Sequence, residues 1–232
     1  DADMINLFDN NNNRIPPTAA LKFPVGKDIQ TGMKRFNCNI AIPFSCHHQY
    51  QRRDSFWAND FVTPIDLMKE GFNEDNEYKL LPAFQKVIFK GGKFFPKNLN
   101  PERLTIFEPI HESQFGDNWN SLLDKNQINQ CREYFQKIKT LFRNYKSIIL
   151  KVGGVEHEML KDGYGKAKIT FEVPSSSLMK SIKGETFDDL LIGNFMKTYL
   201  NKCIDLYYPD FTMAVCKYSD NGGAKAEDEL DK

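Results

Sequence analysis

The sequence predicts an α+β fold in which a mainly antiparallel sheet packs against two long amphipathic helices. The chain has 232 residues, of which 41% are hydrophobic, so it is long enough to bury a sizeable core. Short apolar runs separated by glycine, proline and asparagine dominate the first half and are typical of strands. The second half has the order strand, helix, strand, strand, helix, strand, which favours an α+β arrangement.

The composition along the chain predicts one domain with two polar ends. Residues 1–20 are rich in asparagine and proline and are predicted to form a flexible arm. Residues 21–219 are predicted to form a single α+β domain, because no repeat or linker divides them. Residues 220–232 hold five acidic residues against two lysines and are predicted to form an acidic polar tail. No apolar run is long enough to span a membrane, and the five cysteines lack a metal-type spacing. We therefore expect a cytoplasmic protein with reduced thiols, no cofactor and no membrane partner.

In the first half, three short apolar runs predict strands and a fourth predicts a short helix. Gly91 and Gly92 separate two of the predicted strands and indicate a tight connection that needs a positive φ. The polar and aromatic stretch over residues 45–60 has no clear period and is predicted to be a loop or a strand with a decorated end. The predicted strands are residues 33–44, 83–90 and 104–107, and the predicted helix is residues 65–69.

The second half contains the two predicted long helices. The clearer one covers residues 124–145, because six apolar residues spaced three or four positions apart form one stripe. Asp124 and Gln127 match a capping box at its start. The second helix is predicted over residues 187–207, with Thr186 as its N-cap. The predicted strands are residues 147–152, 166–173 and 211–218.

Basic charge is concentrated in two segments, although the formal net charge of the chain is zero. Residues 121–170 contain ten basic residues against five acidic ones, and residues 79–103 contain six against one. Surfaces of this kind meet the phosphates of nucleic acids without reading their sequence. Solvated faces of ordinary helices and strands are the alternative explanation. The candidate phosphate contacts are Lys90, Lys93, Lys151, Lys161, Lys166 and Lys168.

The stretch from Cys46 to Trp57 interleaves arginines with aromatic residues. Bases stack on aromatic rings and guanidinium groups clamp phosphates, so this pattern favours the binding of single-stranded RNA or DNA. Cys46 with His47 and His48 also permits a second hypothesis, a metal site or a thiol nucleophile. A purely structural loop is the third. The candidate nucleic-acid contacts are Tyr50, Arg52, Arg53 and Trp57.

Two pairs of glycines flank a charged excursion between the strands predicted at residues 147–152 and 166–173. Glycine lets a backbone or a phosphate approach closely, because no Cβ intrudes. Tyr164 could stack on a base at this place. A hairpin with a long hinged loop is the alternative, and the spacing matches neither a Walker A loop nor a dinucleotide-binding fingerprint. The glycines are Gly153, Gly154, Gly163 and Gly165.

Residues 127–173 resemble the C-terminal glycine-rich loop of the RAMP superfamily, the ferredoxin-like, RRM-related RNA-binding subunits of CRISPR-associated complexes in antiviral defence. The shared pattern is an amphipathic helix, a strand, Gly-Gly, a basic excursion, Gly-Tyr-Gly-Lys and a second strand. The resemblance implies a ferredoxin-like or RRM-like C-terminal half, and a subunit that holds guide RNA against these glycines. Glu156, Glu158 and Asp162 depart from the pattern, because carboxylates repel phosphate.

The favoured interpretation is a non-catalytic nucleic-acid-binding subunit of a larger ribonucleoprotein or replication assembly. Its expected partners are RNA or single-stranded DNA and other protein subunits. One alternative is a structural or viral subunit whose exposed aromatic residues contact other proteins. No serine-hydrolase, zincin or kinase motif is present. A metal-dependent hydrolase is the other alternative, with nearby carboxylates and the four histidines His47, His48, His111 and His157.

Overall fold

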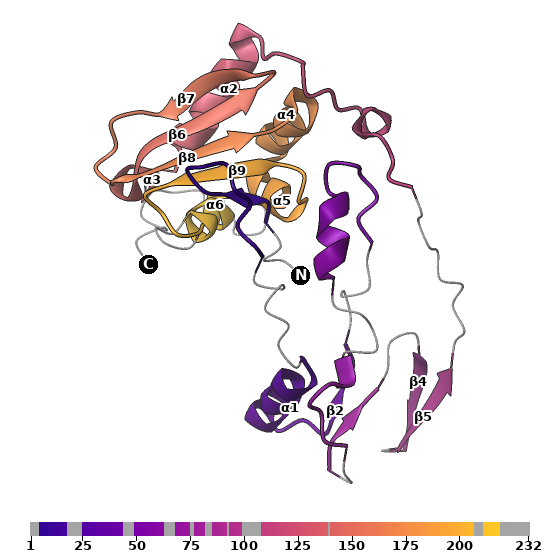
Figure 1. Ribbon diagram of the computed structural model, residues 1–232. Coiled ribbons are helices and arrows are strands. Elements are labelled where there is room, and N and C mark those ends of the chain that lie inside the picture. Colours follow the sequence, from indigo (N-terminus) through magenta and orange to yellow (C-terminus); the bar gives the residue numbers. More distant parts are fainter. Residues whose placement is uncertain are drawn as a thin grey trace. The chain divides into compact units, whose positions relative to one another are not determined.

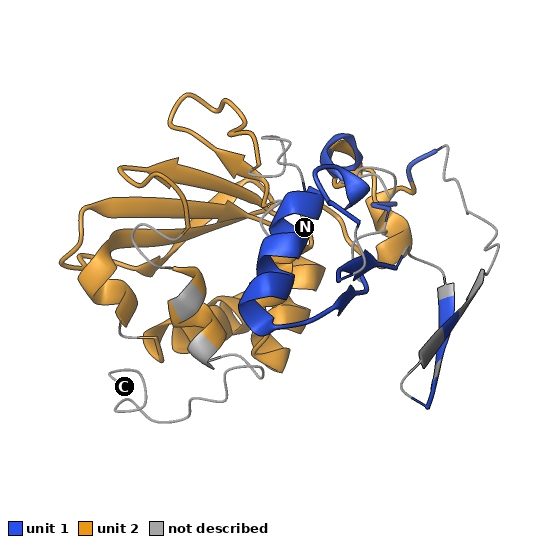
Figure 2. Ribbon diagram, turned by 90° about the horizontal axis from the view of Figure 1, so that it is seen from below, with its two compact units in different colours: residues 1, 19–51, 58–109 blue, residues 2–18, 52–57, 110–232 orange. Residues whose placement is uncertain are grey.

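The chain folds into two compact units, whose residues are coloured separately in Figure 2. Unit 1 contains residues 1, 19–51 and 58–109, and unit 2 contains residues 2–18, 52–57 and 110–232. The prediction of one domain over residues 21–219 was based on the absence of a repeat and of a strong boundary in the sequence. The computed structural model describes residues 5–17, 25–43, 49–62, 68–74, 77–81, 85–91, 93–98, 108–138, 140–206 and 211–218.

Unit 2 is built on a five-stranded sheet (Figure 1). β6 pairs antiparallel with β7 and parallel with β8, while β9 pairs antiparallel with β8 and parallel with β1. The sheet is therefore mixed, where the sequence predicts a mainly antiparallel one. The parallel pairing arises because β7 turns back along β6 and the chain then crosses to the other side of β6. In spatial order the strands are β1 (Leu7–Phe8), β9 (Lys197–Asn201), β8 (Ala167–Glu172), β6 (Tyr145–Val152) and β7 (Val155–Leu160).

Helices of unit 2 cover one face of this sheet (Figure 1). Aromatic rings fill the layer between sheet and helices, where the ring centroid of Phe171 lies 5.2 Å from that of Phe187 and 4.8 Å from that of Phe211. Burial of this apolar layer is the main force that holds unit 2 together. No helix among the described residues is long and apolar enough to span a membrane. The helices are α2 (Lys125–Gln136), α3 (Thr140–Asn144), α4 (Ser175–Gly184), α5 (Phe187–Ile192) and α6 (Thr212–Tyr218).

The long helix predicted over residues 124–145 is in fact two helices and the first residue of a strand. α2 begins at the predicted capping box, in which the Asp124 carboxylate accepts a hydrogen bond from the Gln127 N–H at 2.8 Å. α2 ends at Gln136, and α3 then leads into β6 at Tyr145. The apolar spacing continues across the break because the side chains on both sides of it are buried in the same core. A helical period therefore does not reveal where a helix stops.

The second long helix and the last predicted strand also differ from the structure. α5 ends at Ile192 and β9 follows, whereas the prediction was one helix over residues 187–207. Asn194 adopts a φ of 66°, and this left-handed conformation takes the chain out of the helix. Residues 211–218, predicted as a strand, form α6 instead. Buried apolar residues of α6 recur at three-to-four-residue spacing after Phe211 and pack on the core.

Two predicted strands of unit 2 are confirmed, namely residues 147–152 within β6 and residues 166–173 around β8. Two further elements were not predicted. α4 was missed because it begins with three serines, which are typical of a turn. β7 was missed because Glu156 and Glu158 make its sequence resemble a charged loop. Residues 7–8, in the predicted flexible arm, form β1 because they pair with β9.

The order of elements in unit 2 is β1, α2, α3, β6, β7, β8, α4, α5, β9 and α6. It differs from the β-α-β-β-α-β order of a ferredoxin-like fold, because β7 is an additional strand between β6 and β8.

Unit 1 contains one described α-helix and two small sheets. α1 (Val25–Phe36) precedes β2, which pairs parallel with β3, and β4 pairs antiparallel with β5. A 3₁₀ helix, η2 (Phe56–Phe61), begins in unit 2 and ends in unit 1, and it overlaps the end of the stretch over residues 45–60 for which no helix was predicted. The strands are β2 (Ile40–Ala41), β3 (Lys79–Leu80), β4 (Gln85–Lys90) and β5 (Lys93–Asn98).

The predictions for unit 1 have mixed outcomes. The strand predicted over residues 33–44 is helical up to Phe36, because Gln30 and Met33 are buried one helical turn apart. β4 confirms a predicted strand, and Gly91 has the expected positive φ of 58°. β5 was not predicted. The predicted strand at residues 104–107, most of the helix predicted at residues 65–69 and the tail at residues 220–232 lie outside the described residues.

Candidate functional site

The face of the sheet opposite the helices, called the open face below, carries polar and aromatic side chains. Alternate residues of each strand point to this face, and the pairing register aligns them in rows across the sheet. One row consists of Phe8, Tyr199, Thr170, Ile149 and Glu158. The next row consists of Lys197, Glu172, Lys151 and Glu156.

A hollow of about 590 Å³ lies on the open face beside the turn that follows β1. The Asp9 carboxylate shapes this turn, because it accepts hydrogen bonds from the N–H groups of Asn13 and Asn11 at 2.9 and 2.8 Å. The bonds from the backbone and the side chain of Asn13 hold the pKa of Asp9 below its ordinary value. A hollow of this size can hold a base or a sugar. Its lining includes Asn12, Lys151, Glu156, Lys168, Thr170 and Tyr199.

An aromatic and cationic stack borders the hollow. The rings of Phe8 and Tyr199 stack with 5.2 Å between their centroids. The guanidinium of Arg14 lies 5.4 Å from the ring centroid of Phe8 and 4.2 Å from that of Trp57. The indole N–H of Trp57 donates a hydrogen bond to the Asn194 carbonyl at 3.2 Å, which fixes the ring. The stack therefore joins β1 and β9 to the segment that carries Trp57.

Glu172 balances the charge of two lysines on the open face. Its carboxylate lies 3.5 Å from the Lys151 ammonium and 3.8 Å from the Lys197 ammonium. It also accepts a hydrogen bond from the Tyr199 hydroxyl at 2.7 Å. Burial and this hydrogen bond raise the pKa of Tyr199, so the hydroxyl remains a donor. Lys168 is exposed and has no ion pair among the described residues, so it is the lysine of this face best placed to meet a phosphate.

Two other predicted phosphate contacts, Lys161 and Lys166, lie outside the hollow, in or next to the loop that joins β7 to β8. Tyr164, between them, is 88% exposed. In the same loop the Asp162 carboxylate lies 3.4 Å from the Lys146 ammonium. The loop therefore presents an exposed ring with two lysines, and Asp162 offsets part of the positive charge.

The four glycines of this segment have structural roles. Gly153 and Gly154 form the turn between β6 and β7, with φ values of 60° and 79° that favour glycine. Gly163 and Gly165 instead lie against the backbone of residues 144–145, which a Cβ at either position would overlap. A close approach within the chain therefore explains these two glycines without a phosphate.

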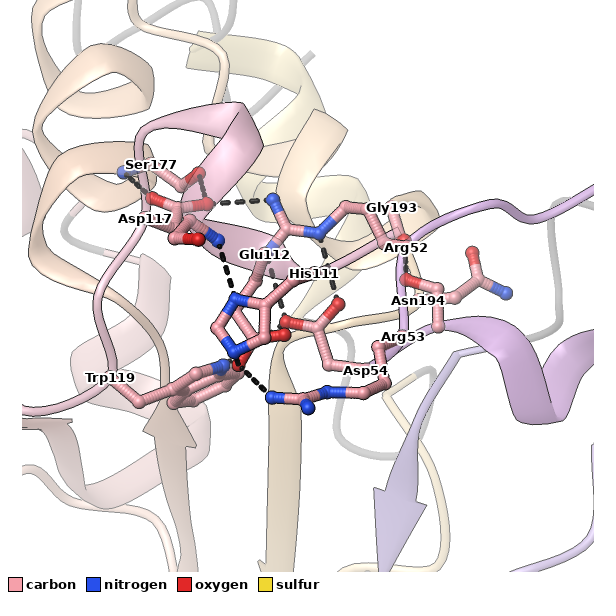
Figure 3. A network of polar contacts seen from close by, with 12 residues as sticks. Arg52, Arg53, Asp54, His111, Glu112, Asp117, Trp119, Ser177, Gly193 and Asn194 are labelled. Carbon is pink, nitrogen blue, oxygen red and sulfur yellow. Dashed lines mark hydrogen bonds and ion pairs between the residues drawn. The ribbon is translucent and has the colours of Figure 1, made fainter. Parts of the chain in front are cut away.

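Arg52, predicted to contact nucleic acid, lies in a buried polar network (Figure 3). Its Nε and one Nη donate to the two carboxylate oxygens of Asp54 at 2.9 and 2.8 Å, and its other Nη donates to Asp117 at 2.6 Å. The guanidinium also lies 4.0 Å from the ring centroid of Phe195. Burial disfavours the charge, but the two carboxylates raise the pKa of Arg52 above its ordinary value. Its hydrogen-bonding capacity is therefore largely used inside unit 2.

Asp117 connects this network to the helices. Its fully buried carboxylate accepts hydrogen bonds from the N–H and the hydroxyl of Ser177, in the first turn of α4, at 3.0 and 2.6 Å. A carboxylate at a helix N-terminus also interacts favourably with the helix dipole. Arg53, by contrast, donates to Glu112 of the 3₁₀ helix η4 (Glu112–Phe115) at 2.9 Å, and its side chain remains 55% exposed.

The remaining predicted contacts lie in unit 1. Tyr50 is half-buried, and its backbone exchanges two hydrogen bonds with the side-chain amide of Asn59. Lys90 and Lys93 are opposite each other at the end of the β4–β5 hairpin. Of the predicted nucleic-acid contacts, the structure therefore brings Lys151 and Lys168 together at the hollow. Trp57 lies in the stack at the border of the hollow.

The hypothesis of a metal-dependent hydrolase depends on histidines that converge. Within the described part of the chain, no three His, Cys, Asp or Glu side chains are grouped as metal ligands. His157 points to the helix side of β7, whereas His111 accepts a hydrogen bond from the Ser113 N–H at the start of η4. His47 and His48 lie outside the described residues.

His157 is expected to make unit 2 sensitive to acid. Its Nε2 is buried without a hydrogen-bond partner among the described residues, and burial together with the charge of Arg132 lowers the pKa of His157 from 6.5. The folded state therefore disfavours the protonated ring, whereas the unfolded state takes up the proton freely. The free energy of unfolding is for this reason unaffected by His157 above the unfolded pKa of about 6.5, and it decreases as the pH falls below that value.

Denaturant unfolding at a series of pH values tests this prediction. The loss of unfolding free energy on acidification should be smaller in His157→Gln, whose side chain stays neutral throughout. Ile204→Ala, at a non-titratable position of unit 2 that is 80% exposed, is the control and should keep the wild-type pH dependence. An unchanged pH dependence in His157→Gln would show that the buried imidazole is not the acid-sensitive group.

Three residues of the open face and its border were not predicted as functional. Phe8 and Arg14 lie in the predicted flexible arm, and Tyr199 lies in a segment predicted as helix. The alternation of Tyr199 with the buried Thr198 and Leu200 is the sequence signal that could have revealed it.

No protein-family model, curated protein or solved structure matches the chain.

Proposed function

We propose that the open face of unit 2 binds single-stranded nucleic acid, either RNA or DNA, and that the protein is a non-catalytic subunit of a larger ribonucleoprotein or replication assembly. The observation that carries this proposal is the stacked pair of Phe8 and Tyr199 beside a hollow lined by Lys151 and Lys168. RRM domains bind RNA with the same kind of surface, a sheet whose aromatic side chains stack on bases. The resemblance of residues 127–173 to RAMP subunits supports the same class of ligand.

Stacking should contribute more to this interface than charge. One base stacked on an aromatic ring is worth about 1–3 kcal/mol. The positive charge of the face is offset, because Glu172 pairs with Lys151, and Glu156 and Glu158 are exposed on β7. Lys168 is then the main phosphate contact, and one contact with a single strand gives a salt slope of only about −0.7.

The compartment and the protein partners are part of the same proposal. The cysteines among the described residues form no disulfide, as expected of thiols in the reducing environment of the cytoplasm. Exposed apolar side chains outside the open face offer contacts for other subunits of the assembly. They include Leu122, Ile192 and Ile204.

Replacing Tyr199 with alanine should weaken the binding of a fluorescently labelled oligouridine or oligothymidine strand by about 5- to 150-fold, which corresponds to the loss of one stacked base. Tyr199→Phe keeps the ring and should retain most of the affinity, although it loses the hydrogen bond to Glu172. Fluorescence anisotropy at about 50 mM salt measures both affinities, because phosphate contacts are strongest at low salt. Thermal melting of each variant verifies folding.

Phe36→Ala provides the matched control, because Phe36 is an exposed aromatic residue of α1 in unit 1. Its affinity should equal that of the wild type. The proposal fails if the wild-type protein binds neither strand at this salt. It also fails if a folded Tyr199→Ala variant binds as tightly as the wild type. Comparison of the two strands identifies RNA or DNA as the preferred ligand.

A further inference from the structure

The β4–β5 hairpin of unit 1 carries lysines opposite each other on one face. The two strands pair in antiparallel register, so opposed residues and every second residue along a strand share a face. The central pair of this face is apolar, and a pair of lysines flanks it on either side. The three pairs are Lys86 with Lys97, Ile88 with Phe95, and Lys90 with Lys93.

The charges of these lysines lower the stability of the paired strands when no ligand is bound. Like charges directly opposite each other destabilise a pair of strands, and a two-stranded hairpin alone is only marginally stable. Neither Lys86 nor Lys90 has an ion pair among the described residues. Residues 79–103 contain one acidic residue, Glu102, against six basic ones. An anion that binds Lys86 or Lys90 would therefore stabilise the hairpin.

The apolar pair indicates which kind of anion fits. Ile88 is 50% exposed and Phe95 is 55% exposed, so both are accessible to a ligand. The two lysine pairs are four residues apart along the strand, a distance of about 14 Å. A single nucleic-acid strand offers phosphates over this length and a flat base between them. A membrane surface fits less well, because two side chains bury less apolar area than one acyl chain, which itself binds membranes only marginally.

We propose that this face of the β4–β5 hairpin is a second, sequence-independent contact for a nucleic-acid strand, with one phosphate at Lys86, another at Lys90 and a base against Phe95. The inference rests on the proposed function, because it assumes that the chain binds single strands. It goes beyond that function, because it assigns most of the salt-dependent affinity to unit 1 and not to the open face.

The double variant Lys86→Gln/Lys90→Gln of the full chain tests this inference with labelled oligouridine between about 50 and 200 mM salt. The loss of two phosphate contacts should weaken binding about 25-fold at about 0.1 M salt, and should make the slope of log K against log salt shallower by about 1.4. Phe95→Ala should weaken binding without a change of slope. The charge-matched control is Lys180→Gln/Lys183→Gln on the exposed surface of α4, which should keep the wild-type slope.

The possible outcomes separate this inference from the proposed function. If the wild-type chain binds no strand, both are overturned. If the wild type binds and the hairpin variant keeps its affinity and slope, the inference alone is overturned. If the variant keeps its oligouridine affinity but loses wild-type binding to phosphatidylserine vesicles, the hairpin contacts an anionic membrane instead. Removal of opposed like charges should not lower the melting temperature, so weaker binding cannot be attributed to unfolding.

Discussion

Replacing Gly165 with alanine should destabilise unit 2 by about 3 kcal/mol or more. The reason is space and not backbone conformation, because the φ of Gly165 lies outside the left-handed region. A Cβ would overlap the carbonyl of Asn144 and would lie 2.5 Å from the backbone nitrogen of Tyr145. These are backbone atoms at the junction of α3 and β6, and Tyr145 is paired with Ala167 of β8. They cannot move aside without disturbing the sheet, so denaturant unfolding should show the full loss.

Gly154→Ala is the matched control for this prediction. Gly154 has a φ of 79°, but nothing lies within 4 Å of the position that its Cβ would occupy. Its replacement should therefore cost only about 1 kcal/mol, from backbone strain alone. If Gly165→Ala proved as stable as Gly154→Ala, the packing role would be refuted. If it also bound oligouridine more weakly, Gly165 would lie against the nucleic-acid backbone, as the RAMP resemblance implies.

Replacing Arg52 with methionine should destabilise unit 2 by about 3–5 kcal/mol, the usual cost of removing one partner of a buried ion pair. Asp117 would keep its hydrogen bonds from Ser177 but would lose the cation that lies 2.6 Å from its carboxylate. Its side chain is fully buried, so water cannot replace the lost charge partner. Asp54 would lose two hydrogen bonds at the same time. Denaturant unfolding at neutral pH measures the loss.

Arg53→Met is the control, because Arg53 is the next residue in the chain and its side chain is 55% exposed. Its ion pair with the buried Glu112 carboxylate should contribute about 1–2 kcal/mol, clearly less than the contacts of Arg52. The double variant Arg52→Met/Asp117→Asn should recover part of the loss, because it removes the buried charge that the single variant leaves unpaired. Equal losses for Arg52→Met and Arg53→Met would contradict the structural role of the network.

The elements that sequence patterns predict correctly are those whose stabilising interactions are local or repeat at short spacing. The capping box at Asp124 joins residues three positions apart. In β8 the alternation of Ala167, Ile169 and Phe171 with exposed or half-exposed residues matches the pleat of a strand. The helix predicted over residues 124–145 fails for the opposite reason. Its apolar stripe reports burial, and the same burial continues through α2, α3 and the start of β6.

The candidate site shows the same division. Lys151 and Lys168 stand out from the sequence through charge, and the structure places both at the hollow. Phe8 and Tyr199 are far apart in the chain and become neighbours only because β1 pairs with β9. Arg52, predicted as a phosphate contact, is engaged by Asp117, a residue that the sequence does not associate with it.

The sequence by itself determines that this chain folds around a core, where β6 and β8 run, where α2 begins, and which segments concentrate basic charge. Only the tertiary structure decides the mixed order of the sheet, the ends of the helices and which face of the sheet the described helices of unit 2 cover. It also decides which charges are balanced by a partner. The physical reason is that periodicity and composition report how polar each position is, whereas strand pairs, ring stacks and ion pairs join residues that are distant in the chain.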